Sequence, residues 1–138
     1  DGKIKVISNK GWHVKDKTTE KVVGGEQPID VSYTIMTLAK FYFVLNKKEY
    51  KQKAKSALNW FLGDNHLHQI VYNPCTGGCY DGVEEQNINL NQGAESTLSY
   101  LMARLTLEKL VMFDKSLKFY KCWASQPQSP PSGSLAIM

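Results

Sequence analysis

The segment from Gln27 to Leu45 constrains the fold most, because apolar residues cover most sides of the helix that it predicts. Pro28 suits the first turn of a helix, where its missing N–H costs nothing, and the Asp30 carboxylate complements the helix dipole there. The apolar residues recur at helical spacing: Val31, Ile35, Leu38, Tyr42 and Leu45, widened by Met36, Ala39 and Phe43. Such a helix needs neighbours on most sides, so we expect an all-α protein of packed helical hairpins in which this helix is deeply buried.

Two further segments have the apolar spacing of helices. After a turn at Asn46-Lys47, residues 49–62 predict an amphipathic helix that ends at Gly63. Its apolar face is formed by Tyr50, Ala54, Ala57, Leu58 and Phe61, and its wet face by Lys51, Lys55 and Asn59. A third helix is expected from about Gln92 to Phe113, and residues 114–125 are expected to begin a fourth. The main apolar stripe of the third helix is Ala94, Leu98, Leu101 and Leu105, with Met102, Leu107 and Leu110 beside it.

Residues 64–91 show little helical periodicity and form a long polar loop between the second and third helices. Residues suited to turns and polar recognition dominate it: Asn65, His66, His68, Asn73, Pro74, Thr76, Gly77, Gly78, Asp81, Gly82, Asn87, Asn89 and Asn91. A loop of this length inside a compact domain is usually either functional or disordered. Its tyrosines and apolar residues indicate an ordered loop with room for a short hairpin: Tyr72, Tyr80, Ile70, Val71 and Ile88.

The two ends of the chain are less regular. Residues 3–12 predict an extended lead-in with Ile4, Val6 and Trp12 as apolar anchors. Residues 126–138 contain the run QPQSPPSGS, whose Pro/Ser-rich composition is typical of a disordered tail. We therefore expect one helical domain over residues 1–125, followed by the tail.

Composition argues against several classes of function. The chain of 138 residues has a net charge of +4 but only one arginine, Arg104, so recognition of a nucleic-acid backbone is not expected. The densest lysine group, within residues 47–55, lies on the wet side of a helix pattern and is expected to be a solvated face. No apolar run is long enough to predict a membrane partner. Three cysteines, an odd number, indicate a reducing compartment, so we expect a cytoplasmic protein.

The starts of the first and third helices resemble each other. In EQPIDVSYTIMTLA and NQGAESTLSYLMAR, Gln27 matches Gln92 and Asp30 matches Glu95. A buried inner helix followed by a wet outer helix is the repeating unit of an α/α toroid or solenoid. Two parallel inner helices would place both N-termini at one end, together with the long loop and these four side chains. Asp30 and Glu95 are equally suited to capping their helices and nothing more.

The carboxylates of this rim offer one kind of chemistry. Glycoside hydrolysis needs two carboxylates across a cleft, one of them a proton donor. Glu26, Asp30, Asp81 and Glu95 are available, with Asp81 and Glu95 as the candidate catalytic residues. The sequence gives no separation between them, so it leaves open whether any two act together.

Two alternative chemistries use the cysteines. His66, His68, Cys75 and Cys79 are the side-chain types that bind zinc, but their spacing matches no finger or ribbon pattern. Cys79 lies in TGGCYDG, where the glycines would let the backbone approach a ligand, but no histidine is an obvious partner for a nucleophilic thiol. We therefore expect no metal and no other cofactor.

The stretch YNPCTGGCYDG, followed by NINLNQGAESTLSYLMARL, resembles the C-terminal region of a family of bacterial glycosyltransferases. EQPIDVSYTIMTLAKFY and NWFLGDNHL are similar to the same region, so the likeness covers about Trp12 to Leu110. In that family the region is an α/α toroid, similar to that of six-hairpin glycosidases, and it follows a nucleotide-sugar-dependent transferase domain. No segment of this chain matches the transferase domain, and the chain is too short for a complete six-hairpin ring.

The resemblance implies a carbohydrate-associated domain, part of an α/α toroid with a long ordered polar loop, that binds or positions a glycan. We expect no transferase activity from this chain alone. An incomplete ring exposes apolar surface, so a missing catalytic domain or self-association is expected. A glycan-cleaving enzyme and a purely structural helical module are the alternatives. The candidate substrate-binding residues are Glu26, Gln27, Asn65, Tyr80, Asp81, Asn89, Asn91, Gln92 and Glu95.

Overall fold

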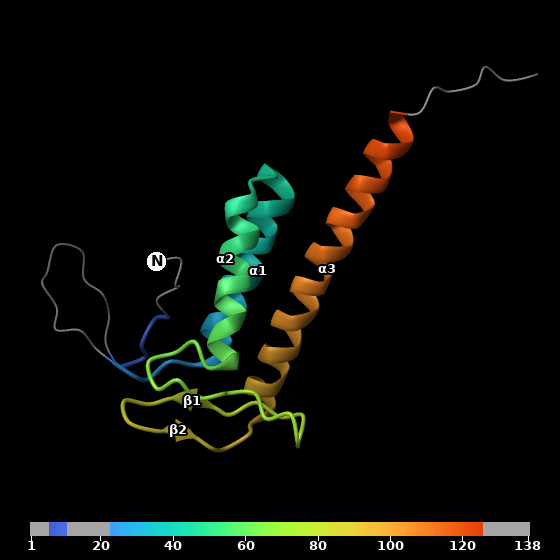
Figure 1. Cartoon of the computed structure of the whole chain (residues 1–138). Coiled ribbons are helices and arrows are strands. Elements are labelled where there is room, and N and C mark those ends of the chain that lie inside the picture. The colour runs from blue at the N-terminus through green and yellow to red at the C-terminus, as the bar shows by residue number, and fades with distance from the viewer. Residues whose placement is uncertain (1–5, 11–22, 126–138) are drawn as a thin grey trace, which may run out of the picture.

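The computed structural model describes residues 6–10 and 23–125, which form mainly helices (Figure 1). In chain order the elements are α1 (Pro28–Leu45), α2 (Lys48–Asn59), the 3-10 turn η1 (Trp60–Leu62), β1 (Gly82–Val83), β2 (Ile88–Asn89) and α3 (Ala94–Ala124). α1 and α2 form an antiparallel hairpin, α3 packs along α1, and β1 and β2 pair in a small antiparallel hairpin within the long loop. The predictions of a mostly helical chain and of a short hairpin in the loop are confirmed. The expected anchors Ile4 and Trp12 and the expected tail, residues 126–138, lie outside the described residues.

Local sequence sets the ends of the helical hairpin, although the second predicted helix, residues 49–62, is divided into α2 and the 3-10 turn η1. Gln27 precedes α1 in an extended conformation, and Pro28 occupies the first helical turn. Asn46 adopts a left-handed conformation (φ 51°) and donates its N–H to the Tyr42 carbonyl at 2.8 Å, which closes α1. Gly63, with φ 106°, ends the turn that follows α2 in the same way.

α3 is one continuous helix from Ala94 to Ala124, so the predicted end at Phe113 and the predicted fourth helix are wrong. No glycine or proline interrupts this stretch, and nothing in its backbone forces a break. Asp114, the expected start of the fourth helix, instead accepts a hydrogen bond from the Tyr42 hydroxyl and pairs with the Lys51 ammonium. These contacts attach the second half of α3 to the α1–α2 hairpin.

The core runs between the three helices and extends into the loop. Phe61 is fully buried and packs edge-on against Trp60 and Tyr100, with ring centroids 5.1 Å and 5.2 Å apart. Tyr72 of the loop stacks on Tyr100 at 4.1 Å. This aromatic cluster therefore joins η1, α3 and the loop. The other buried apolar residues are Val31, Ile35, Ala39, Tyr42, Ala54, Ala57, Val71, Cys79, Val83, Ile88, Ala103, Leu107 and Leu110.

α3 turns a different side to the core from the one that its leucines predict. The predicted stripe is exposed, with Leu98, Leu101 and Leu105 at 57%, 44% and 57%. The buried side is formed instead by Ser96, Ser99, Tyr100 and Ala103, together with Leu107 and Leu110, which were predicted to lie beside the stripe. Because apolar residues surround α3, periodicity alone does not select the buried side; the packing of Tyr100 against Phe61 selects it.

α1 is also less buried than predicted. α2 and α3 cover one side of it, whereas Tyr33, Phe41, Phe43, Val44 and Leu45 remain exposed. Together with the leucines of α3, these side chains leave a broad apolar surface in the described part of the chain. None of the helices described has both the length and the apolarity needed to cross a membrane.

The N-termini of α1 and α3 lie at one end of the molecule, beside the loop that contains β1 and β2, as the resemblance between the two helix starts predicts (Figure 1). The backbone of Glu26 links two segments that meet at this end. It pairs with Ser8 on one side and with Val83 of β1 on the other, where the two residues exchange N–H···O bonds of 3.1 Å and 2.9 Å. The start of α1 is thereby fixed to the loop before the helix begins.

Gly24, two residues before this pairing, has no space for a side chain. It has φ +83°, and a Cβ would lie 2.5 Å from the carbonyl carbon of Glu84 and 2.7 Å from the Cα of Glu85. Gly77 has a similar φ of +74° but open space around it.

We expect Gly24→Ala to lower the free energy of unfolding by about 3 kcal/mol or more, because the new side chain would be strained by the left-handed backbone and would also clash with Glu84 and Glu85. Gly77→Ala should lower it by about 1 kcal/mol, because only the strain of the left-handed backbone acts there. Urea unfolding measures both, and equal losses would contradict the close backbone contact.

The exposed apolar surface of α1 and α3 predicts self-association of the purified chain. Val44 on α1 and Leu105 on α3 are 80% and 57% exposed. The double substitution Val44→Lys and Leu105→Lys should shift the chain toward the monomer, because it places charge on this surface, with a stability change of only about 0.5 kcal/mol. Static light scattering over a concentration series measures the mass. An unsubstituted chain that stays monomeric at every concentration contradicts the prediction.

Candidate functional site

The Asp81 carboxylate holds the loop against the start of α3. Its Oδ1 accepts hydrogen bonds from the Gly93 N–H at 2.8 Å and from the Ser96 hydroxyl at 2.7 Å, and its Oδ2 accepts one from the Asn91 side chain. A carboxylate at a helix N-terminus is stabilised by unpaired N–H groups and by the helix dipole. A Cβ at Gly93 would lie 2.8 Å from this Oδ1, so glycine permits the contact. These four residues form the Asp81 clamp.

The clamp also sets the charge of Asp81. Burial raises the pKa of the carboxyl, but the hydrogen bonds from Ser96, Asn91 and Gly93 outweigh burial, and the pKa falls below its ordinary value of 3.8. Asp81 is therefore ionised at neutral pH and holds no proton to donate there. Both of its oxygens already accept hydrogen bonds from the protein, so its contacts are those of an anchor.

Two further contacts fix the glycine-rich turn of the loop on α3. The Cys79 N–H donates to the Thr97 hydroxyl at 3.2 Å, and the Thr76 hydroxyl donates to Oε1 of Gln92 at 2.7 Å. Gly78 lies against Gln92, because a Cβ at Gly78 would be 2.9 Å from the Gln92 Cδ. Gln92 is exposed, and its amide nitrogen has no hydrogen-bond partner within the described residues.

Glu26 and Asn65, both predicted to bind substrate, make their contacts inside the fold. The Trp60 indole N–H donates to Glu26 at 2.5 Å, and His66 Nδ1 lies 3.8 Å from the other carboxylate oxygen. Asn65 is 8% exposed, and its amide nitrogen donates to the carbonyls of Trp60 and Gln69 at 3.0 Å and 2.8 Å. Asn65 thus finds the partners that a buried amide needs, and the half-buried Glu26 joins the start of α1 to Trp60 and His66.

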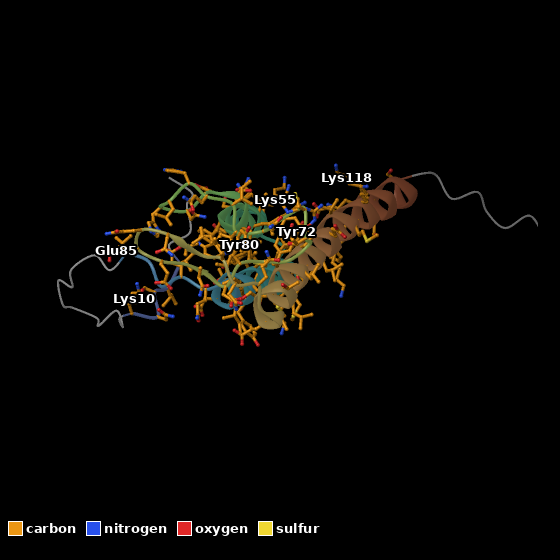
Figure 2. All side chains as sticks on the ribbon, turned by 90° about the horizontal axis from the view of Figure 1, so that it is seen from below. Lys10, Lys55, Tyr72, Tyr80, Glu85 and Lys118 are labelled. Atoms are coloured by element: carbon orange, nitrogen blue, oxygen red, sulfur yellow. The ribbon has the colours of Figure 1, made fainter. Side chains whose placement is uncertain are left out.

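Tyr80, Asn89 and Asn91 lie nearer the surface. Tyr80 is half-buried, and its hydroxyl accepts a hydrogen bond from the Asn73 amide at 3.0 Å. Asn89 and Asn91 are exposed, and Asn89 Oδ1 accepts the Asn91 N–H at 3.2 Å. Figure 2, a view from below, shows Tyr80 and Tyr72 in the middle of the end that the loop forms. This part of the loop therefore presents amides and tyrosines at the surface.

A hollow of about 170 Å³ lies between the first halves of α1 and α3. Tyr33 and Leu98 are 61% and 57% exposed, so the hollow is open to solvent. Glu95 is the only one of the predicted site residues in its lining, and it makes no ion pair or side-chain hydrogen bond within the described part of the chain. The lining consists of Ile29, Ser32, Tyr33, Met36, Glu95, Leu98, Ser99 and Met102.

Gln27 and Asp30 lie at the start of α1 and are half-buried. Burial raises the pKa of Asp30, and the Thr34 hydroxyl donates to its backbone carbonyl at 2.8 Å. Neither residue lines the hollow that contains Glu95. The carboxylates Asp30 and Glu95 thus share one end of the molecule without facing each other across this hollow.

Within the described residues, His66, His68, Cys75 and Cys79 do not gather as either alternative chemistry requires. Among residues 6–10 and 23–125, no group of three His, Cys, Asp or Glu side chains is placed to hold a metal ion. His66 contacts the backbone carbonyl of Glu84 at 2.9 Å. Cys79 is fully buried, and burial, followed by the nearby Asp81 charge, raises the pKa of its thiol to about 12. A thiol that stays protonated at neutral pH is a poor nucleophile.

Three polar residues of the hollow, Ser32, Tyr33 and Ser99, were not among the sequence candidates. The sequence offered a signal for Tyr33 alone. Tyr33 and Leu98 occupy equivalent positions after Gln27 and Gln92 in the two similar helix starts. The two residues both line the hollow, but their equivalent positions alone do not predict that they face each other, because that depends on how α1 and α3 pack.

No protein-family model matches the chain, and a search of curated proteins finds no match either.

The Asp81 clamp predicts a pH-dependent contribution to stability. Asp81→Asn should lower the free energy of unfolding at neutral pH by about 1–3 kcal/mol, because a neutral amide weakens three hydrogen bonds to a charged acceptor. The pKa of Asp81 is lower in the folded chain than in the unfolded one. Its contribution is therefore complete above the unfolded pKa and is lost as the pH falls through the folded pKa, so the difference between the two proteins should shrink below about pH 4.

Urea unfolding at a series of pH values measures this difference. Glu95→Gln is the matched control, because it also removes a carboxylate at the start of α3, but Glu95 is exposed and does not belong to the clamp. It should change stability by no more than about 0.5 kcal/mol. Equal losses in the two variants would show that the clamp has no special role.

Proposed function

We propose that this chain is a carbohydrate-associated helical domain, part of an α/α toroid, which binds or positions a glycan at the end shared by the loop and the N-termini of α1 and α3. The observation that carries the proposal is the hollow between α1 and α3. It combines an exposed tyrosine and apolar side chains with an unpaired carboxylate, Glu95, and two serines. The likeness of TGGCYDG and NQGAEST to a glycosyltransferase-associated region supports the same function.

The chemistry of the hollow matches that of a sugar. A sugar ring has apolar C–H faces, which pack on side chains such as Tyr33 and Met36. Its hydroxyls donate to a carboxylate and accept from a serine, and Glu95, Ser32 and Ser99 offer both. A volume of about 170 Å³ is small for a whole ligand, so the hollow suits one sugar unit of a longer glycan.

The loop supplies a second set of contacts beside the hollow. The Asp81 clamp fixes Asn91 and the start of α3, and the contact with Thr76 fixes Gln92. Side chains that are held in place before binding lose less conformational entropy when a ligand arrives. The exposed amides of Asn91 and Gln92, with Tyr80, are therefore suited to the hydroxyls of sugar units outside the hollow.

The arrangement of helices supports a partial toroid. α1 and α3 are parallel, and α2 returns antiparallel to α1, as inner and outer helices of a toroid do (Figure 1). Apolar side chains remain exposed on α1 and α3, where further hairpins or a separate catalytic domain would pack. Glycan cleavage receives less support, because Glu95 is the only carboxylate in the lining of the hollow and cleavage needs two.

Thermal shift against a panel of neutral mono- and oligosaccharides tests the proposal. A ligand that binds only the folded chain raises the melting temperature by mass action. Glu95→Gln and Tyr33→Ala should weaken binding of an active sugar by about tenfold each, consistent with losing about 1.4 kcal/mol of contact. Glu108→Gln is the control, since Glu108 is exposed on α3 but does not line the hollow. Asp81 variants are unsuitable here, because they alter stability.

Two outcomes would contradict the proposal. One is a cooperative melt that no saccharide shifts, which would favour a purely structural helical module. The other is sugar binding that survives both Glu95→Gln and Tyr33→Ala, which would place the glycan away from the hollow.

A further inference from the structure

A second hollow, of about 530 Å³, lies between the second half of α3 and the α1–α2 turn, at the end of the molecule away from the loop. Figure 1 shows α3 diverging from the hairpin towards this end. The volume of this second hollow falls within the range of about 300–1,000 Å³ that is usual for ligand pockets. Half of its lining residues are lysines: Lys48, Lys51 and Lys55 from α2, and Lys118 and Lys121 from α3. These five residues form the lysine hollow.

The one carboxylate in the lining does not neutralise this charge. Asp114 accepts a hydrogen bond from the Tyr42 hydroxyl and pairs with Lys51. The other four lysines have no ion pair within the described part of the chain. Figure 2 shows Lys55 and Lys118 on the same side of the molecule, each on its own helix. The hollow therefore keeps a net positive charge of about four.

Folding brings these like charges together. The side chain of Lys51 is only 18% exposed. Its pKa is lowered, mainly by burial and to a smaller extent by the nearby charges of Lys55 and Lys118. The lysines of α2 alone are expected on a solvated helix face. That expectation does not explain why they converge with lysines of α3 around one concave space. An anion in the hollow would reduce the mutual repulsion of the ammonium groups.

We propose that the lysine hollow binds a ligand that carries clustered phosphate groups, such as a di- or triphosphate. Lysine ammonium groups act on phosphate as compact point charges on flexible stems, and several of them can adjust around one polyanion. This site lies at the opposite end of α3 from the proposed glycan hollow and shares no lining residue with it. It stands whether or not the chain binds glycans.

The shape of the site favours a compact phosphate cluster over a nucleic acid. Nucleic-acid binding surfaces extend along a backbone and commonly use arginine, whereas Arg104 does not line this hollow. Two sources fit the same chemistry: a soluble di- or triphosphate and the headgroup of a phosphorylated lipid.

Isothermal titration of the full chain with inorganic triphosphate is the first test. The double substitution Lys55→Gln and Lys118→Gln should weaken binding at least tenfold, because it removes one charge from each wall of the hollow. The matched control is Lys53→Gln with Lys109→Gln, which removes the same charge from the same two helices outside the lining. The control should bind within about twofold of the unsubstituted chain, and added salt should weaken all binding.

Circular dichroism melts of both double variants check that they fold. We expect both to be folded, because all four lysines are exposed. Absence of triphosphate binding to the unsubstituted chain at millimolar concentration, together with absence of vesicle binding in the second test, overturns the proposal. An equal loss in the two double variants also overturns it, because the effect would then follow net charge and not the hollow.

Co-sedimentation with vesicles separates the two sources. Phosphatidylcholine vesicles with and without a phosphatidylinositol bisphosphate serve as the probe. Binding that requires the phosphorylated lipid, and that Lys55→Gln with Lys118→Gln removes, supports a lipid headgroup as the ligand. Triphosphate binding without vesicle binding supports a soluble ligand. Glu95→Gln should leave either kind of binding unchanged, which distinguishes failure here from failure of the glycan site.

Discussion

The hydrogen bonds of the ionised Asp81 carboxylate hold together the end of the molecule where the loop meets the helices. The carboxylate accepts hydrogen bonds from the Gly93 N–H just before α3, from the Ser96 hydroxyl in the helix and from the Asn91 side chain in the loop. Because the positive end of the helix dipole lies there, one charged side chain stabilises both the last part of the loop and the first turn of α3. The position of Glu95 depends on this contact, since it lies in the turn that the clamp holds.

A second carboxylate has a comparable role in the other half of α3. Asp114 binds Tyr42 of α1 and Lys51 of α2, and so attaches α3 to the hairpin far from the loop. The two anchors leave two hollows of different chemistry. The one near Asp81 is mainly apolar with a free carboxylate, whereas the one near Asp114 is strongly basic. Each hollow combines side chains from α3 with those of the α1–α2 hairpin, so its composition depends on how α3 is anchored.

The apolar surfaces show how far hydrophobic pattern guides such a fold. α1 and α3 are apolar around most of their circumference, so each has more apolar surface than its neighbours in this chain cover. Leu98, Leu101 and Leu105 look like a core stripe and face solvent, while Ser96 and Ser99 look polar and are buried. Both serines are small, and the Ser96 hydroxyl is satisfied by Asp81 of the loop, which allows the start of α3 to lie against the loop.

The sequence by itself determined the elements whose signals are local: Pro28 and Asn46 bound α1, Gly63 ends the turn after α2, and the loop carries a hairpin. It also predicted that the starts of α1 and α3 share one end. Only the tertiary structure decided which of the predicted carboxylates are held by other side chains, because Glu26 and Asp81 find their partners far along the chain. The same holds for the lysine hollow, since no local pattern records that lysines of α2 and α3 converge.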